Sequence, residues 1–337
     1  MYFWKNGFLA ALLLPALLAG CRSPGRTPEW VLNPKTVYPE AQYLVAVGEG
    51  DTRSAAENSA AANLARIFES HIESDERLID QSRETNTALE RTTDFTSDIN
   101  ILSSQTLCNI QHAEAWQDRH SRLHAVAYLD RRETAAIYRS RIDAQTARIQ
   151  FLLAQAEQTD NPLKKYAALR TAARHAAENT AMLQQLKVIH PPSAASAAPS
   201  YSENNLRKTL ADTAKQIRVQ IAVTGDDSRR MTVALEELVT RYGFVVGSPA
   251  VLKFDGRVSI TDTAQRTADL MFVRYELVVQ IKDSDDTVVA SINNKGREGH
   301  VSLAEARIRS FRTLETVIEA RGSQHLDTYF DALITQP

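Results

Sequence analysis

Residues 42–68 read QYLVAVGEGDTRSAAENSAAANLARIF, a short apolar strand followed by an alanine-rich helix. The strand ends in Gly48-Glu49-Gly50, and Ser54-Ala-Ala-Glu57 has the spacing of a capping box, which begins a helix. The helix is predicted to continue to about His71. Its apolar positions recur three and four residues apart, at Ala56, Ala60, Leu64, Ile67 and Phe68. This stretch therefore predicts a helix packed on a sheet.

The two glycines have two interpretations. A G-x-G between a strand and a helix is part of the dinucleotide-binding fingerprint, but the third glycine position is occupied by Arg53, and no acidic residue ends a second strand about twenty residues later. The alternative is a strand-to-helix connection in which glycine supplies a positive φ or lets the helix approach the sheet closely. We expect the second.

The first module continues with segments of different character. Residues 72–86 are polar with partial alternation and predict a solvated strand, whereas residues 104–117 and 122–130 predict a hairpin. The hairpin carries His112, His120, His124 and Trp116. These histidines would be a metal site only with further ligands at suitable spacing, and neither a cysteine nor a carboxylate provides them. We expect exposed hairpin histidines and no metal.

Residues 131–190 change to a helical pattern with a break at residues 159–162, where Pro162 suits a first helical position. One tetratricopeptide-like pair is an alternative, but a solenoid needs about three repeats. We expect a single antiparallel helical hairpin. Residues 191–202, PPSAASAAPSYS, are of low complexity and predict a flexible linker.

After the linker, the pattern predicts strands and helices in the order β-α-β-β-β-β-α-α, with an antiparallel sheet and terminal helices over 302–320 and 323–333. The acidic run Asp283–Asp286 has oxygen ligands but lacks the later residues of a calcium loop, so it predicts a turn. Asp226 and Asp227 predict a helix cap. Leu270, Phe272 and Val278 lie opposite the main apolar stripe of their strand. They would form an exposed patch or lie buried under helices, and we expect burial.

The amino terminus predicts where the protein is located in the cell. Lys5 precedes an apolar run from Phe8 to Ala19, which is too short to span a membrane and is typical of a signal peptide. The run ends in Leu18-Ala19-Gly20-Cys21, small residues before a cysteine, as a lipoprotein signal peptidase requires. Acylation of Cys21 would anchor the mature chain, and Arg22 in the next position favours the outer membrane. A chance cysteine after an ordinary secretory signal is the alternative.

Composition narrows the function further. The 337 residues include 39 basic and 41 acidic side chains, a net charge of −2 that shows no electrostatic signature of nucleic-acid binding. The chain has no P-loop, G-x-S-x-G or H-E-x-x-H, so we assign no catalytic residue and no cofactor. With Cys21 lipidated, Cys108 has no disulfide partner and is expected to be a small buried residue.

Several motifs resemble the LPP20 family of bacterial lipoproteins. They are Pro28-Glu-Trp30-Val-Leu-Asn-Pro34, the strand ending in Gly48-Glu49-Gly50, the alanine-rich helix, Glu114-Ala-Trp116-Gln-Asp118, and His124-Ala-Val-Ala-Tyr128-Leu-Asp130. The resemblance covers about residues 28–135 and implies a small α/β domain without known catalytic residues; similar domains occur in flagellar-ring and motility-associated lipoproteins. The C-terminal region more weakly resembles TolB-like and penicillin-binding-protein-activator lipoprotein domains, which bind envelope proteins.

Together these features predict an α+β protein of two sandwich-type modules, each a helix on a mostly antiparallel sheet, joined by a helical hairpin and the flexible linker. The predicted segments are a signal peptide (1–20), a tether (21–29), an LPP20-like domain (30–135), the hairpin (136–190), the linker (191–202) and a C-terminal domain (203–337). We expect a non-enzymatic envelope lipoprotein that docks to another envelope protein, in a flagellar or cell-wall assembly. A cell-wall hydrolase and a small-molecule or lipid carrier are the alternatives.

Overall fold

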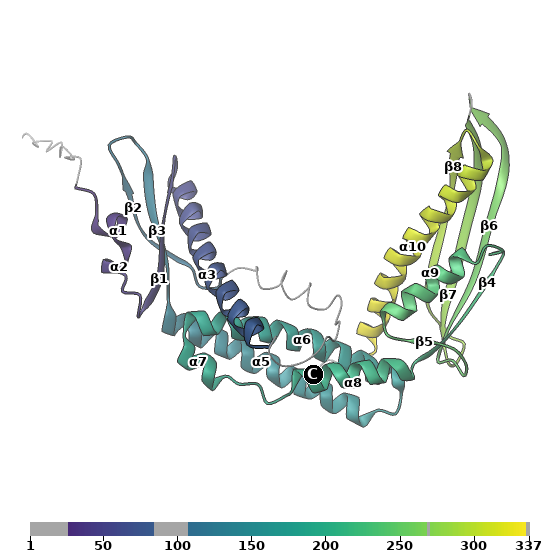
Figure 1. Cartoon of the computed structure of the whole chain (residues 1–337), viewed down its shortest axis with the longest axis horizontal. Coiled ribbons are helices and arrows are strands. Elements are labelled where there is room, and N and C mark those ends of the chain that lie inside the picture. Colours follow the sequence, from purple (N-terminus) through teal and green to yellow (C-terminus); the bar gives the residue numbers. More distant parts are fainter. Residues whose placement is uncertain (1–25, 84–106, 268–269, 335–337) are drawn as a thin grey trace, which may run out of the picture. The chain divides into compact units, whose positions relative to one another are not determined.

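The computed structural model describes residues 26–83, 107–267 and 270–334 (Figure 1). For residues 71–83 and 264–267 it describes the backbone alone. The chain divides into two compact units, which are described separately. The N-terminal unit comprises residues 1–74 and 106–134, and the C-terminal unit comprises residues 75–105 and 135–337. Cys21 and the predicted signal peptide lie outside the described residues.

The N-terminal unit is a three-stranded antiparallel sheet in the order β1-β3-β2, formed by β1 (Tyr43–Gly50), β2 (Gln111–Gln117) and β3 (Leu123–Asp130). Helix α3 (Arg53–Arg83) packs against it. The predicted strand, helix and hairpin are confirmed. The strand expected from residue 72 is wrong, because α3 continues as a helix to Arg83. This segment contains Glu, Arg and Leu, which favour helix, and alternation alone did not outweigh them.

Gly48 explains how closely α3 approaches the sheet. A Cβ atom added at Gly48 would lie 2.0 Å from the Ala60 backbone nitrogen, and one at Gly50 would lie 2.7 Å from the Ala55 Cβ. Neither Gly48 nor Gly50 has a positive φ. The glycines therefore provide space for the helix, the second of the two roles expected from the sequence.

The opposite face of this sheet is covered by two short helices, α1 (Glu29–Leu32) and α2 (Pro34–Val37). Trp30 is buried here in a cluster with Tyr38 and Val126. The Tyr38 ring lies 5.6 Å from Tyr43 and 5.1 Å from Tyr128, with both distances measured between centroids. These contacts hold the α1–α2 segment firmly on the sheet.

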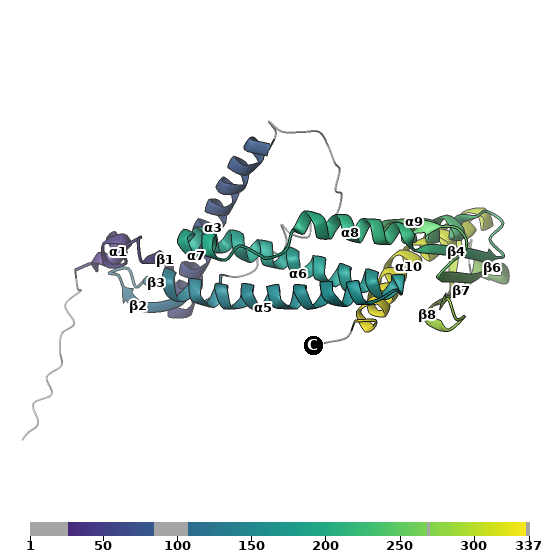
Figure 2. The ribbon, with the colours of Figure 1, turned by 90° about the horizontal axis from the view of Figure 1, so that it is seen from below.

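The C-terminal unit begins with helices, α5 (Arg131–Gln158), α6 (Pro162–Ile189), α7 (Pro191–Ser196) and α8 (Glu203–Gln216). Figure 2 shows α5, α6 and α8 running side by side. Asn161 caps α6 by accepting hydrogen bonds from the backbone N–H groups of Leu163 and Lys164. Buried alanines of α6 pack against Ile149 and Leu152 of α5. The structure has the predicted helical hairpin.

The sheet of this unit has five strands in the order β5-β4-β6-β7-β8: β4 (Arg218–Thr224), β5 (Val245–Val246), β6 (Leu252–Thr267), β7 (Leu270–Asp283) and β8 (Val288–His300). The pairs β6–β7 and β7–β8 are antiparallel, but β4 runs parallel to both β5 and β6. The long pairings are antiparallel, as the predicted mostly antiparallel sheet requires. The parallel pairing of β4 was not predicted, and it arises because the helix after β4 is a crossover that returns the chain in the same direction.

Two helices cover one face of this sheet, α9 (Arg230–Arg241) and α10 (Leu303–Ala332) (Figure 1). The sequence predicted two terminal helices separated near Gly322, whereas α10 is continuous. Gly322 is buried, and a Cβ atom there would lie 2.5 Å from Leu238 Cδ2. The glycine therefore marks a close crossing of α10 and α9 rather than a helix end.

The helical hairpin and this sheet share one hydrophobic core. Tyr166 of α6 is buried with its ring centroid 4.9 Å from Phe244 and 5.0 Å from Phe330. The structure thus differs from the flexible linker expected over 191–202, since residues 191–196 form α7 and Ala194 is buried. His190 caps this helix by accepting a hydrogen bond from the Ser193 backbone N–H. Hairpin and sheet form one compact unit.

The face of the sheet away from α9 and α10 is only partly shielded. Leu270 is 40% exposed, and Phe272 and Val278 are half-buried. The expected burial of these residues is therefore wrong, because both covering helices pack on the other face. The mixture of helices with two sheets otherwise confirms the predicted α+β class.

Candidate functional site

An open groove of about 1080 Å³ lies between α9 and α10 of the C-terminal unit. It is lined by side chains from both helices and from the loop that precedes α9. They are Ser228, Arg229, Arg230, Val233, Ala234, Glu236, Glu237, Thr240, Arg241, Arg312, Glu315, Thr316 and Glu319. The lining is rich in charge of both signs and contains neither histidine nor cysteine. It is a surface groove rather than an enclosed apolar pocket.

Two ion pairs join the two helices across the groove. Arg230 donates from Nε to Glu315 Oε1 at 2.7 Å and from Nη2 to Oε2 at 2.9 Å, and its guanidinium lies 5.2 Å from the centroid of the Phe311 ring. Arg241 Nη1 donates to Glu319 Oε1 at 2.6 Å. The two parallel hydrogen bonds between Arg230 and Glu315 fix the relative orientation of the two side chains as well as pairing their charges. The walls of the groove are therefore held at a defined separation.

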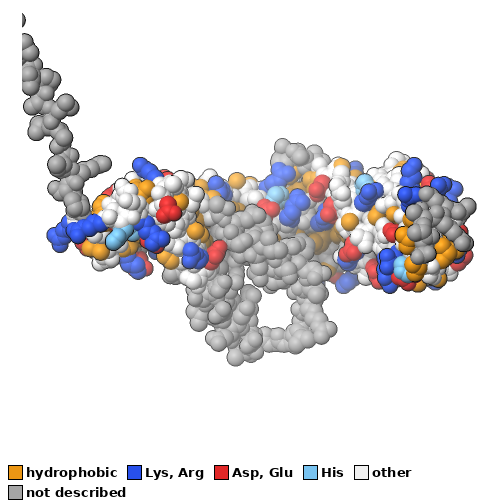
Figure 3. Space-filling model, turned by 90° about the horizontal axis from the view of Figure 1, so that it is seen from above, with side chains coloured by type: hydrophobic (Ala, Val, Ile, Leu, Met, Phe, Trp, Pro, Cys, Tyr) orange, Lys and Arg blue, Asp and Glu red, His pale blue; other side chains and the backbone are white. Residues whose placement is uncertain are grey.

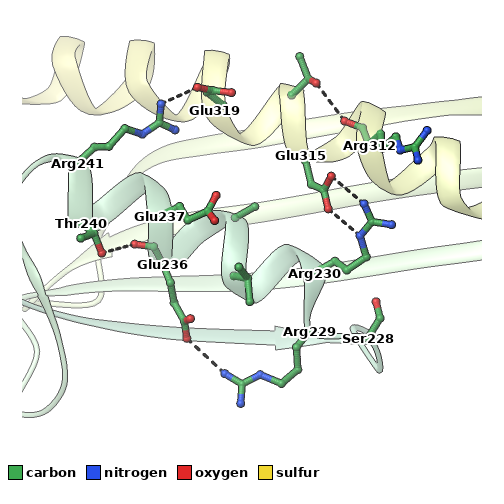
Figure 4. A pocket seen from close by; sticks show the side chains of 13 residues that line it. Ser228, Arg229, Arg230, Glu236, Glu237, Thr240, Arg241, Arg312, Glu315 and Glu319 are labelled. Carbon is green, nitrogen blue, oxygen red and sulfur yellow. Dashed lines mark hydrogen bonds and ion pairs between the residues drawn. The ribbon is translucent and has the colours of Figure 1, made fainter. Parts of the chain in front are cut away.

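Two other charges of the lining point away from such pairs (Figure 4). Among the described residues, neither the Arg312 guanidinium nor the Glu237 carboxylate has an ion-pair partner. Val233 is 43% exposed beside them. An unpaired cation, an unpaired anion and an exposed apolar side chain are what a partner surface of complementary charge would use.

The loop before α9 positions the basic end of this groove. Gly225 has φ +77°, and a Cβ atom there would lie 2.2 Å from the Val258 backbone oxygen. Asp226 then accepts hydrogen bonds at Oδ2 from the Thr232 backbone N–H and from its hydroxyl. Arg229 has a left-handed backbone with φ 56°. This loop turns Arg229 and Arg230 toward the groove. Asp226 accepts from an N–H group of the first turn of α9, as a capping side chain does, although the N-cap position itself is Arg229.

A polar cluster near the other end of α9 ties the helical hairpin to α10. Asp327 Oδ1 accepts a hydrogen bond from Arg170 Nη2 at 2.6 Å and another from the Tyr242 hydroxyl at 2.6 Å. The Tyr166 hydroxyl donates to the Tyr242 backbone oxygen at 3.2 Å. Burial raises the pKa of the Tyr166 phenol to about 12. Burial, followed by the hydrogen bond to Asp327, also raises the pKa of Tyr242.

This cluster predicts a loss of stability in alkali. An unfolded tyrosine loses its proton near pH 10, whereas the folded chain keeps Tyr166 protonated until about pH 12. The folded state therefore binds more protons in this window, and its free energy of unfolding falls as pH rises, by about 3 kcal/mol over the whole window from pH 10 to 12. Urea unfolding at pH 8, 10 and 11 should show this fall, with a smaller slope for Tyr166→Phe. An unchanged slope in that variant would assign the effect to other groups.

The hairpin histidines do not converge on one point. His124 Nε2 lies 3.5 Å from Asp118 Oδ2, and its ring packs 5.5 Å from Trp116. His120 lies exposed in the turn, and His112 pairs with Ala127 on the other side of a register shift. Among the residues that the structure describes, no group of three potential ligands is arranged to hold a metal ion.

The remaining sequence-predicted residues have structural positions. Asp283 accepts hydrogen bonds from the backbone N–H groups of Asp285 and Thr287, and so forms the predicted turn. Cys108 is half-buried, so the expectation that it would be a buried residue is wrong. None of the described helices combines the length and hydrophobicity needed to cross a membrane.

Sequence reasoning missed the groove itself. The pattern over Met231–Tyr242 predicted a helix, and residues 302–320 predicted another, but nothing in either segment indicated that their charged faces would meet. The spacing of Arg312, Glu315 and Glu319 at three and four residues was the available signal. The same spacing is equally typical of a helix face that is simply exposed to solvent. In Figure 3, cationic and anionic side chains are interspersed in the same way over the visible surface.

Comparison with known proteins locates the family resemblance. No curated protein matches the chain. Among solved structures, the secreted protein HP1454 of Helicobacter pylori is 13% identical over 83% of this chain and 97% of its own, with a TM-score of 0.47. A minor lipoprotein of Acinetobacter baumannii is 11% identical over 37% of this chain and 98% of its own, with a TM-score of 0.25. The model of the LPP20 lipoprotein family matches residues 28–130, which confirms the resemblance of this region to that family.

Proposed function

We propose that this chain is a lipid-anchored protein of the outer membrane that serves as a non-enzymatic docking component of an envelope assembly. The observation that carries the proposal is the order of two features along the chain. Leu18-Ala19-Gly20-Cys21 follows a signal-like apolar run, and a match to a lipoprotein family begins at residue 28. A diacylated and N-acylated Cys21 would hold the chain firmly, since each buried methylene contributes ~0.8 kcal/mol.

The anchor is tested by replacing its thiol. We expect the native chain to sediment with membranes and to have a mature N-terminus at Cys21 with the mass of the added acyl chains. Cys21→Ser should be released to the soluble fraction, while Cys108→Ser should remain with the membranes as a matched control. A mature chain whose Cys21 carries no lipid, with the leader cleaved elsewhere, would contradict the anchor.

The groove between α9 and α10 supports docking over the two alternatives. Three of its four carboxylates, those of Glu236, Glu315 and Glu319, are already paired with arginine, so they are poorly placed to act as the acid of a hydrolase. A carrier of apolar molecules needs an enclosed and mostly apolar cavity, whereas this groove is open and charged. Fixed walls with unpaired Arg312 and Glu237 suit a charged protein surface.

Docking is tested with a photo-cross-linking residue at Val233, and with the same residue at Val288 as the control. The two side chains are 43% and 46% exposed, but Val288 lies in the edge strand β8 outside the groove. In envelopes of the source cells we expect a discrete cross-linked product from position 233. Adding Arg312→Glu and Glu237→Lys should reduce it at least several-fold, because both charges would then repel the partner. Equal products at both positions would contradict docking in the groove.

A further inference from the structure

The N-terminal unit carries a second feature, which does not involve the groove of the C-terminal unit. Leu32 at the end of α1 is 68% exposed, the highest value among the exposed large hydrophobic side chains described, and Val37 at the end of α2 is 43% exposed. Leucine and valine normally lose contact with water on folding. Their exposure contrasts with the burial of Trp30 in α1 and of Tyr38, the residue directly after α2.

The α1–α2 segment presents these side chains from a fixed position. Trp30 is 4% exposed and Tyr38 is 8% exposed, and both belong to the cluster that covers the sheet. The Asn33 backbone N–H donates to the Glu29 oxygen, and the Tyr38 N–H donates to the Pro34 oxygen, so each short helix is closed by its own hydrogen bond. Leu32 and Val37 therefore stay outside while the segment that bears them is held by its aromatic residues.

The short stretch of chain between Cys21 and α1 indicates what can cover Leu32 and Val37. Only residues 22–28 separate Cys21 from the first residue of α1, which at ~3.5 Å per residue allows at most about 28 Å. If Cys21 is acylated, the bilayer that holds its chains is always within this reach of the first residue of α1, and Leu32 lies one helical turn further on. The net charge of the nearby described ionic groups is close to zero, because Lys35 pairs with Glu40 at 3.0 Å. Contact with lipid would thus rest on the apolar side chains rather than on attraction to anionic headgroups.

We propose that α1 and α2 seat the N-terminal unit on the bilayer, with Leu32 and Val37 entering the boundary between headgroups and acyl chains. This seat rests on the proposed lipidation of Cys21 and adds a second point of attachment. One flexible anchor leaves a domain free to rotate, whereas an anchor and an apolar contact together fix which side faces the membrane. Because the acyl chains keep the segment close to the surface, a weak apolar contact suffices.

The seat is tested in the full lipidated chain, reconstituted in vesicles of phosphatidylcholine with 20% phosphatidylglycerol. An environment-sensitive fluorophore is attached at Leu32→Cys or Val37→Cys in a Cys108→Ser background. The same probe at Val233→Cys is the matched control, since Val37 and Val233 are both 43% exposed. We expect the first two probes to shift to shorter wavelength and to be quenched at least threefold more than the third by lipids that carry a nitroxide near the headgroup.

A second variant distinguishes insertion from an effect of the probe. Leu32→Asp should at least halve the quenching of the probe at Val37→Cys while circular dichroism remains unchanged, because a carboxylate opposes entry into the bilayer. Equal quenching at positions 37 and 233 in vesicles that float with the protein would overturn the seat while leaving the anchor in place. Failure of the protein to float, together with an unmodified Cys21, would overturn the anchor and the seat with it.

Discussion

Replacing Gly48 by valine is expected to unfold the N-terminal unit or to leave it barely stable. The new Cβ atom would lie 2.0 Å from the Ala60 backbone nitrogen and 2.5 Å from the Ser59 carbonyl carbon, and both are backbone atoms of α3 that cannot turn aside as a side chain can. The helix would have to lift away from the strand. Overpacking of a core costs about 1–3 kcal/mol and sometimes more, and a clash with backbone falls at the upper end. Urea unfolding followed by circular dichroism measures the loss.

Glu49→Val provides the matched control for this substitution. Glu49 is the next residue of β1 and points away from α3, with an exposed side chain whose ion pair to Arg122 spans 3.5 Å. A surface pair of this kind contributes about 1 kcal/mol at most, so Glu49→Val should have a small effect. If Gly48→Val and Glu49→Val shifted the unfolding midpoint equally, the close approach of α3 to β1 would be disproved.

Truncation of Tyr166 to alanine should destabilise the C-terminal unit by about 3–5 kcal/mol, the usual cost of removing a buried aromatic ring. Tyr166 belongs to α6, yet its ring packs on Phe244 and Phe330 and its hydroxyl donates to the Tyr242 backbone oxygen. The loss should therefore reach the sheet as well as the hairpin. Hydrogen exchange in β4 and in α6 should accelerate together.

Lys187, an exposed residue near the end of α6, supplies the control. Lys187→Ala should leave hydrogen exchange in β4 and in α6 unchanged. A Tyr166→Ala protein in which α6 exchanges faster while β4 keeps its protection would mean that hairpin and sheet unfold independently. That result would restore the domain boundary expected at residues 191–202.

Local patterns were sufficient for much of the fold. The strand over Tyr43–Gly50, the hairpin of β2 and β3, and the helix break before Pro162 were all predicted, because a period of two, a capping residue and a proline act within a few residues. The errors lie where distant parts decide. Gly322 resembles a helix end until Leu238 is seen against it, and β4 resembles an antiparallel strand until its crossover is known.

The groove was less accessible from sequence than the fold. Arg230 and Glu315 are 85 residues apart and meet only because α9 and α10 lie on the same face of the sheet. Which charges remain unpaired depends on this packing, so Arg312 and Glu237 had no signal of their own. The low-complexity segment after Ile189 was misleading for a related reason: Pro191 begins a helix once His190 supplies a cap.

The parallel pairing of β4 with β6 also affects how the chain reaches its native state. Strands β6, β7 and β8 are joined by short connections and can pair soon after each is available, since closing a small loop costs little entropy. Strand β4 comes earlier in the chain but must wait for residues 225–251 before β6, its longer partner, exists. During synthesis and export, its apolar side chains Val219, Ile221 and Val223 are therefore without a sheet for longer than those of any later strand. During this interval these side chains expose the unfinished C-terminal unit to aggregation.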